Sequence, residues 1–120
     1  MISVTNLTQV YRGGKGVFDL SFTIKEGEAF GYLGPNGAGK TTTIRNLLGF
    51  MNATSGSATI NGKDCRANAA SLQHMIGYLP GEIAFFDHMS GTEFLNLISD
   101  LRRQRDRTRR ADLLERFELD

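Results

Sequence analysis

Apolar and polar residues alternate near the start of the chain in the manner of half-buried strands. Every second residue from 18 to 24 is apolar, which predicts a strand with one face toward a core. Residues 2–7 predict a strand before it, and the glycine-rich stretch at residues 11–16 predicts the turn between them. Residues 57–60 predict a third strand, closed by Asn61-Gly62, a pair typical of tight turns. The apolar face of the second strand comprises Phe18, Leu20, Phe22 and Ile24.

Two continuous apolar runs predict a different kind of strand. Residues 29–33 and residues 75–79 are short, mostly apolar and flanked by turn residues, as in strands that are buried on both faces. The first run follows a Glu-Gly-Glu turn, and the second ends at Pro80-Gly81. We therefore expect two buried strands at these positions.

Helical spacing marks the segment between these two runs. Ile44, Leu47 and Leu48 lie at the spacing of one helix face, which predicts a helix that begins near Gly39. Residues 68–74 predict a further short helix.

The last thirty residues predict helices throughout. Ser90-Gly91-Thr92-Glu93 spells a capping box, with Ser90 as N-cap and Glu93 at N3. Apolar residues follow at helical spacing up to residue 101, and a second helix is expected over residues 108–117. That helix is expected to bury Leu113, Leu114 and Phe117. Strands are therefore expected to dominate the front of the chain and helices the back.

The most informative motif joins the first apolar run to the first helix. Residues 34–42 match G-x-x-x-x-G-K-[ST], the phosphate-binding P-loop, and strand, glycine loop and helix follow in the order it requires. Glycines let several backbone N–H groups converge on one anion, and the helix points its positive dipole end at it. Lys40 would reach the β- and γ-phosphates, and the Thr41 hydroxyl would ligate Mg²⁺. The motif comprises Gly34, Pro35, Asn36, Gly37, Ala38, Gly39, Lys40, Thr41 and Thr42.

Bulk composition narrows the class of protein. The formal net charge of +1 provides no overall field that would attract nucleic acid or an anionic membrane. The single cysteine, Cys65, excludes an internal disulfide and suits a reducing compartment. No apolar run approaches the roughly 20 residues of a membrane span, and the N-terminus lacks the pattern of a signal peptide. We expect a cytoplasmic protein without direct membrane insertion.

The order of these segments resembles the nucleotide-binding domain of ATP-binding cassette (ABC) transporters. The resemblance covers residues 2–120 and rests on the P-loop, the segments at 47–50 and 54–56, and the run at 75–80, which looks like the strand that leads into the family's Q-loop. Pro80-Gly81-Glu82, followed by Phe85-Phe86-Asp87 and Ser90-Gly91, resembles the bacterial drug and ABC-2-type exporters. The family resemblance implies an incomplete α/β fold. Residues 1–80 would form a P-loop NTPase core with an antiparallel β subdomain, and residues 81–120 the Q-loop region with the start of a helical subdomain.

The resemblance also implies roles for individual residues. It assigns residues 34–39 to the phosphate cradle, Lys40 to the β- and γ-phosphates, Thr41 to Mg²⁺ and Thr42 to the α-phosphate. Tyr11 stands where the family places an aromatic ring that stacks on adenine, which agrees with the flat face that a base requires. The alternative is that Tyr11 only fills a turn.

Two departures from the family pattern change the functional interpretation. Glu82 stands near the position of the Q-loop glutamine, where it either offers an oxygen to Mg²⁺ or lies in solvent. The LSGGQ-type signature, the Walker B aspartate with its catalytic glutamate, and the switch histidine are not found in the sequence. We therefore expect an N-terminal fragment or truncated product that binds ATP and Mg²⁺ but does not complete hydrolysis by itself, although the parent protein would be an ATPase.

Other residues leave alternatives open. Six arginines between residues 102 and 110 either form a solvated face, which interleaved aspartates favour, or touch RNA or lipid headgroups. Phe85 and Phe86 either complete a small core or contact a membrane partner. His74 and His88 are isolated, which argues against a metal site.

The resemblance implies the ATP-binding subunit of an ABC exporter. Its partners would be a transmembrane permease subunit and a second ATP-binding subunit, and it would lie peripherally at the inner face of the cell membrane, without nucleic acid. The rival interpretations are a soluble ABC ATPase of non-transport function, a stand-alone nucleotide-binding module without catalysis, and a P-loop kinase.

Overall fold

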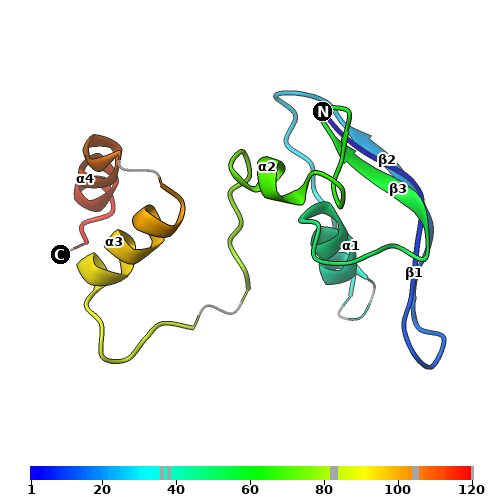
Figure 1. The fold of residues 1–120 in the computed structure, drawn as a ribbon, viewed down its shortest axis with the longest axis horizontal. Coiled ribbons are helices and arrows are strands. Elements are labelled where there is room, and N and C mark those ends of the chain that lie inside the picture. Colours follow the sequence, from blue (N-terminus) through cyan, green and yellow to red (C-terminus); the bar gives the residue numbers. More distant parts are fainter. Residues whose placement is uncertain (36, 38, 82–83, 104–105, 120) are drawn as a thin grey trace. The chain divides into compact units, whose positions relative to one another are not determined.

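The structure of the chain is a computed structural model. It describes residues 1–120 except 36, 38, 82–83, 104–105 and 120. The chain forms two compact units, Met1–Gly77 and Tyr78–Asp120. Figure 1 labels the helices and the strands β1, β2 and β3.

The first unit contains a four-stranded antiparallel sheet. Its strands pair in the order β2-β1-β3-β4, so β1 lies between β2 and β3. The helix α1 (Lys40–Leu47) packs against β2 and β3. The buried core of the unit comprises Val4, Leu7, Ala58 and Cys65. The strands are β1 (Ile2–Val10), β2 (Gly16–Ile24), β3 (Ser55–Ile60) and β4 (Lys63–Asp64). This sheet confirms the strands expected around residues 2–7, 18–24 and 57–60.

Two bulges shape the pairing of β1 with β2. Between the pairs Val4–Phe22 and Leu7–Leu20, β1 contains one residue more than β2. Between Leu7–Leu20 and the next pair, Gln9–Val17, the extra residue is on β2. Asn6 and Asp19 take positive φ values of 46° and 48° there, a conformation that Asn and Asp tolerate better than most residues. The Asn6 amide donates to Asp19 Oδ1 at 2.6 Å, which ties the two bulges together.

The second bulge changes which side chains of β2 point inward, so one part of the predicted apolar face is wrong. Leu20, Phe22 and Ile24 are partly buried as expected. Phe18 is 59% exposed, whereas Val17 is only 7% exposed. The extra residue in β2 reverses the alternation of side chains, so Val17 takes the inward position that the simple pattern assigned to Phe18.

The two apolar runs are not strands, which corrects the prediction for residues 29–33 and 75–79. A strand requires a neighbour for its backbone N–H and C=O groups, and no strand in the described ranges pairs with either run. Residues 29–33 instead contact the sheet through side chains. The rings of Phe30 and Tyr32 lie 5.1 Å and 5.9 Å from the ring of Phe22.

The helices of the first unit differ in detail from the prediction. The short helix α2 (Ala69–Gln73) lies within the expected residues 68–74. In α1 the buried residues are Thr42, Thr43 and Asn46, while Ile44 from the predicted apolar face is exposed. The polar groups can be buried because they bond internally. Thr43 Oγ1 donates to the Gly39 carbonyl, and the Asn46 amide donates to the Thr42 carbonyl, both at 2.9 Å.

The second unit contains α3 (Gly91–Leu101) and α4 (Arg107–Arg116). The predicted capping box is confirmed: Ser90 Oγ accepts from the Glu93 N–H at 3.2 Å, and Glu93 Oε2 accepts from the Ser90 N–H at 2.7 Å. Leu113 and Leu114 are half-buried, but Phe117 follows the end of α4 and is exposed, contrary to the prediction. None of the helices in the described residues is long and apolar enough to traverse a bilayer.

Candidate nucleotide-binding site

The P-loop segment leads directly into α1. Gly39 is the N-cap of this helix with φ 94°, and Gly37 has φ 87°. Side chains with a Cβ rarely adopt such values, so glycine is required for the backbone to turn here. Gly34 and Pro35 are exposed at the start of the segment. Two predicted residues of the loop, Asn36 and Ala38, lie outside the described residues.

A contact with β2 fixes the end of the loop. A Cβ placed on Gly39 would lie 2.4 Å from Val17 Cγ2, so the loop approaches β2 more closely than any other residue type allows. Val17 reaches this position because of the second bulge in β2. Sequence reasoning missed Val17, because strict alternation pointed to its neighbour Phe18.

Lys40 begins α1 and folds back over the loop. Its ammonium group donates a hydrogen bond to the Gly34 carbonyl, which joins the two ends of the P-loop segment. Thr41 is exposed beside it, and Thr42 is buried. The next residue, Thr43, accepts a hydrogen bond from the Tyr32 hydroxyl at 3.2 Å, because its own hydroxyl hydrogen is donated to the Gly39 carbonyl. The loop is therefore held from both sides by polar contacts.

Tyr11 lies against the same helix. Its hydroxyl is 2.9 Å from Thr42 Oγ1 and 3.5 Å from Met51 Sδ, to which it donates. A phenol has one hydrogen to donate, so Thr42 is the donor when the Tyr11 hydrogen bonds to the sulfur. The structure thus brings Tyr11 and the P-loop threonine together, although they are 31 positions apart in the sequence.

These residues enclose a pocket of about 380 Å³. Two lysines, Lys15 and Lys40, line it, and none of the described lining residues is acidic. Its size lies within the range of small-ligand pockets, and its glycines and cations suit a polyphosphate, so the residues present fit a nucleotide. Sequence reasoning missed Lys15, which it treated as part of a turn. The lining comprises Tyr11, Lys15, Gly16, Gly37, Gly39, Lys40, Thr41 and Thr42.

Of the two residues predicted to ligate Mg²⁺, the structure describes only Thr41. Glu82 lies outside the described residues. Within the described ranges no group of three or more His, Cys, Asp or Glu side chains could hold a metal ion. Thr41, the predicted Mg²⁺ ligand, is exposed at the pocket and free to reach an ion held mainly by phosphates.

Comparisons with known proteins agree with this geometry. The family model described as ABC transporter matches residues 17–120. The ABC transporter ATP-binding protein YxlF of Bacillus subtilis is 36% identical over 118 residues, which cover 96% of this chain and 38% of YxlF. The bacitracin transport ATP-binding protein BcrA of Bacillus licheniformis is 39% identical over 95 residues, which cover 79% of this chain and 31% of BcrA.

A solved structure titled as the ATP-binding subunit of an ABC transporter matches with a TM-score of 0.83 at 25% identity, over 99% of this chain and 51% of that one. This likeness confirms the expected α/β class, an incomplete P-loop NTPase core with an antiparallel β subdomain. The chain spans only about a third of the length of these curated relatives. The family model and the relatives show that the chain belongs to the ABC transporter ATP-binding proteins.

Proposed function

We propose that the chain is the ATP-binding part of an ABC exporter and that it binds MgATP in the pocket beside Tyr11. The observation that carries the proposal is the convergence of Lys40, Gly37, Gly39 and Tyr11 on one pocket whose described lining has no acidic residue. Coulomb attraction between two ammonium groups and a polyphosphate favours binding there. ATP-binding subunits of this family function together with transmembrane components. The parent protein would therefore couple ATP hydrolysis to transport.

Each residue has a proposed part in nucleotide binding. Backbone N–H groups of the segment from Gly34 to Gly39, except Pro35, which has none, hold phosphate oxygens. The Lys40 ammonium exchanges the Gly34 carbonyl for the β- and γ-phosphates. Thr41 Oγ1 ligates Mg²⁺, which when bound would neutralise charge on the phosphates. Thr42 contacts the α-phosphate, and the Tyr11 ring stacks on adenine.

The test is ATP affinity of matched lysine variants. Lys40→Ala removes the charge beside the phosphates and should weaken MgATP binding at least tenfold. Lys63→Ala removes a similar charge from β4, outside the pocket, and should leave affinity unchanged. Thr41→Ala should remove the Mg²⁺ dependence of binding. If Lys40→Ala binds MgATP as tightly as the parent chain, the P-loop assignment is wrong.

We also propose that these 120 residues do not hydrolyse ATP by themselves. Phosphoryl transfer depends on positioning and on charge stabilisation, and the sequence contains no signature motif, no Walker B pair and no switch histidine. Glu82 is proposed to substitute for the Q-loop glutamine as an oxygen ligand. A phosphate-release assay checks the proposal, with steady turnover that disappears in Lys40→Ala as the contrary result.

The proposed partners are a permease subunit and a second ATP-binding subunit at the inner face of the membrane. Phe85 and Phe86 support the permease contact, because they are 63% and 53% exposed and line an apolar pocket of about 380 Å³ with Phe94 and Leu114. When chain and permease are co-expressed, Phe85→Ser should lower co-purification without changing ATP affinity. Unchanged co-purification would assign these rings to a local core.

The soluble ABC ATPase remains the second candidate function. Proteins of that kind carry a second cassette or a long coiled coil, so the full coding sequence of the gene discriminates between a soluble ATPase and a transport subunit. One signature motif without a second cassette supports the transport proposal.

A further inference from the structure

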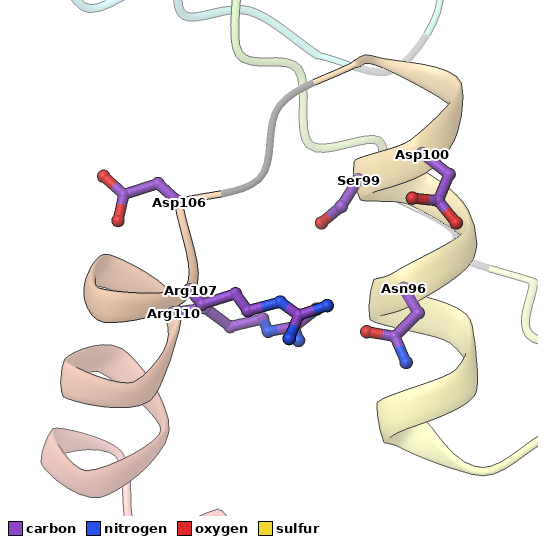
Figure 2. Close-up of a pocket in the computed structure, with 6 residues that line it drawn as sticks. All are labelled: Asn96, Ser99, Asp100, Asp106, Arg107 and Arg110. Carbon is purple, nitrogen blue, oxygen red and sulfur yellow. The ribbon is translucent and has the colours of Figure 1, made fainter.

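A second pocket lies wholly within the second unit, between α3 and α4. Its volume is about 240 Å³. Figure 2 shows the two helices on either side of it and the side chains that line it. The lining comprises Asn96, Ser99 and Asp100 from α3, Asp106 at the N-cap of α4, and Arg107 and Arg110 from α4.

Two arginines dominate the α4 side of this pocket. Arg107 and Arg110 are three residues apart, so they lie on the same face of α4. In Figure 2 both side chains extend from α4 toward α3. Other arginines surround them in the sequence. One ion pair on α4 joins Arg116 to Asp112 at 3.7 Å, and among the described residues no carboxylate is found paired with Arg107 or Arg110. Two like charges that share a pocket repel each other, and an anion between them removes that cost.

The α3 side supplies neutral donors. The Asn96 amide and the Ser99 hydroxyl line the same space one turn apart. In Figure 2 the Asn96 and Ser99 side chains project from α3 on the side that faces the arginines. Two guanidinium groups, an amide and a hydroxyl can therefore donate hydrogen bonds into one pocket from two helices.

Two carboxylates border the pocket and must be accounted for. Asp106 Oδ1 accepts from the Arg109 N–H at 2.9 Å as the cap of α4. Figure 2 shows its side chain directed away from α3. Asp100 lies on the α3 wall, and its negative charge opposes an incoming anion.

We propose that this pocket binds a phosphate group, carried either by a small phosphorylated compound or by a phospholipid headgroup. A phosphate offers three or more acceptor oxygens in a tetrahedral arrangement, which match donors on two opposite walls, whereas a carboxylate offers two oxygens in a plane. Guanidinium groups bind phosphate with paired, charge-assisted hydrogen bonds. The pocket is separate from the P-loop, and the proposal does not depend on nucleotide binding there.

The experiment uses the whole chain with Lys40→Ala, so that phosphate does not report on the P-loop. Inorganic phosphate is titrated into ¹⁵N-labelled protein, and the signals of the Asn96 amide and of the two arginine Nε–H groups are followed by NMR. Arg107→Gln/Arg110→Gln should weaken phosphate binding at least tenfold. Arg103→Gln/Arg109→Gln changes the same charge in the same basic segment outside the pocket, and it should retain affinity within twofold.

A vesicle arm distinguishes the two sources of phosphate. Co-sedimentation with phosphatidylglycerol vesicles, absent with phosphatidylcholine vesicles, is compared for the same two double variants. Loss in the pocket variant alone assigns the site to a lipid headgroup. Phosphate binding that depends on the pocket, without vesicle binding, assigns it to a free phosphorylated compound.

Asp100→Asn keeps the test decisive if the arginine variants fold poorly. Removal of the competing carboxylate should strengthen phosphate binding several-fold. Equal losses of phosphate affinity in the two double variants would show that the arginines act only as a solvated basic face. That result would overturn the proposal. It is likewise overturned if Asp100→Asn destabilises the α3–α4 region and does not strengthen phosphate binding, because the arginines would then serve an ion pair between the helices.

Discussion

At the scale of single residues, the side chains proposed to bind phosphate form hydrogen bonds within the protein. The Lys40 ammonium bonds to the Gly34 carbonyl, and the Thr42 hydroxyl bonds to Tyr11. The same groups are proposed to hold phosphates, so nucleotide binding would exchange these internal partners for phosphate oxygens.

Tyr11 provides the first prediction. Stacking of a base on an aromatic ring contributes roughly 1–3 kcal/mol in nucleic-acid complexes, and we expect the lower end at this half-exposed site. Tyr11→Ala should therefore lower ATP affinity about fivefold, whereas Tyr11→Phe keeps the ring and should lower it less. Isothermal titration calorimetry of the two variants decides between ring and hydroxyl. Equal losses would mean that the hydrogen bond to Thr42, and not the ring, supports binding.

Cys65 provides a second prediction at this scale. The side chain is buried, and burial, followed by the charge of Asp64, raises the pKa of its thiol to about 11. At pH 8 the thiolate fraction is then roughly a hundred times smaller than for an ordinary cysteine. Reaction with a disulfide reagent should be slow in the native chain and fast in urea. Similar rates in both conditions would contradict the buried position in the core.

At the scale of elements, prediction succeeds where a pattern is local and fails where it depends on a neighbour. The capping box of α3 lies within four consecutive residues and could be predicted from them. The runs at 29–33 and 75–79 have the composition of buried strands, but composition does not supply the paired backbone that a strand requires. The position of Val17 depends on a bulge formed jointly by Asp19 and β1, which periodicity in one strand does not encode.

The same distinction applies to the nucleotide pocket. Lys40, Thr41 and the glycines of the loop could be predicted because the P-loop specifies chemistry at fixed spacing. Lys15 could not, because its place in the pocket follows from how the β1–β2 turn lies beside α1.

The capping box carries a prediction about pH. The Ser90 backbone N–H, and then the Ser90 side chain, lower the pKa of Glu93. A lowered pKa means that the stabilisation is complete above the unfolded value of about 4.3 and is lost as pH falls through the folded value. The helical signal of α3 should therefore decrease on acidification in this range. Glu93→Gln can still form the box and should remove this dependence.

Circular dichroism measured from pH 7 to pH 2 checks this prediction. Glu115→Gln on α4 is the matched control, because it removes an exposed carboxylate outside the box, and it should leave the transition in place. A pH dependence that is the same in Glu93→Gln and in the parent chain would show that other carboxylates cause it.

At the scale of the whole molecule, the first unit has a small core and a large apolar surface. Its buried hydrophobic cluster is centred on Val4, Leu7, Ala58 and Cys65. Leu33 is 92% exposed, and Met75 and Phe50 are more than half exposed. Exposed apolar side chains favour association, so we expect the purified chain to be marginally stable and prone to self-associate.

Nucleotide should offset this weakness, because a ligand that binds only the folded state stabilises it by mass action. At a concentration one hundred times its Kd the stabilisation is about 2.7 kcal/mol, which for a unit of this size raises Tm by on the order of 10 °C. A thermal melt with MgADP should show this shift in the parent chain and in Lys63→Ala but not in Lys40→Ala. The α3–α4 unit lacks the P-loop, so the melting temperature of its helical signals should shift less than that of α1.

The contrary result is a sharp, cooperative melt of monomer whose Tm does not change with MgADP, together with steady ATP turnover. It would contradict the view that these 120 residues depend on ligand for stability and would favour a self-sufficient small ATPase.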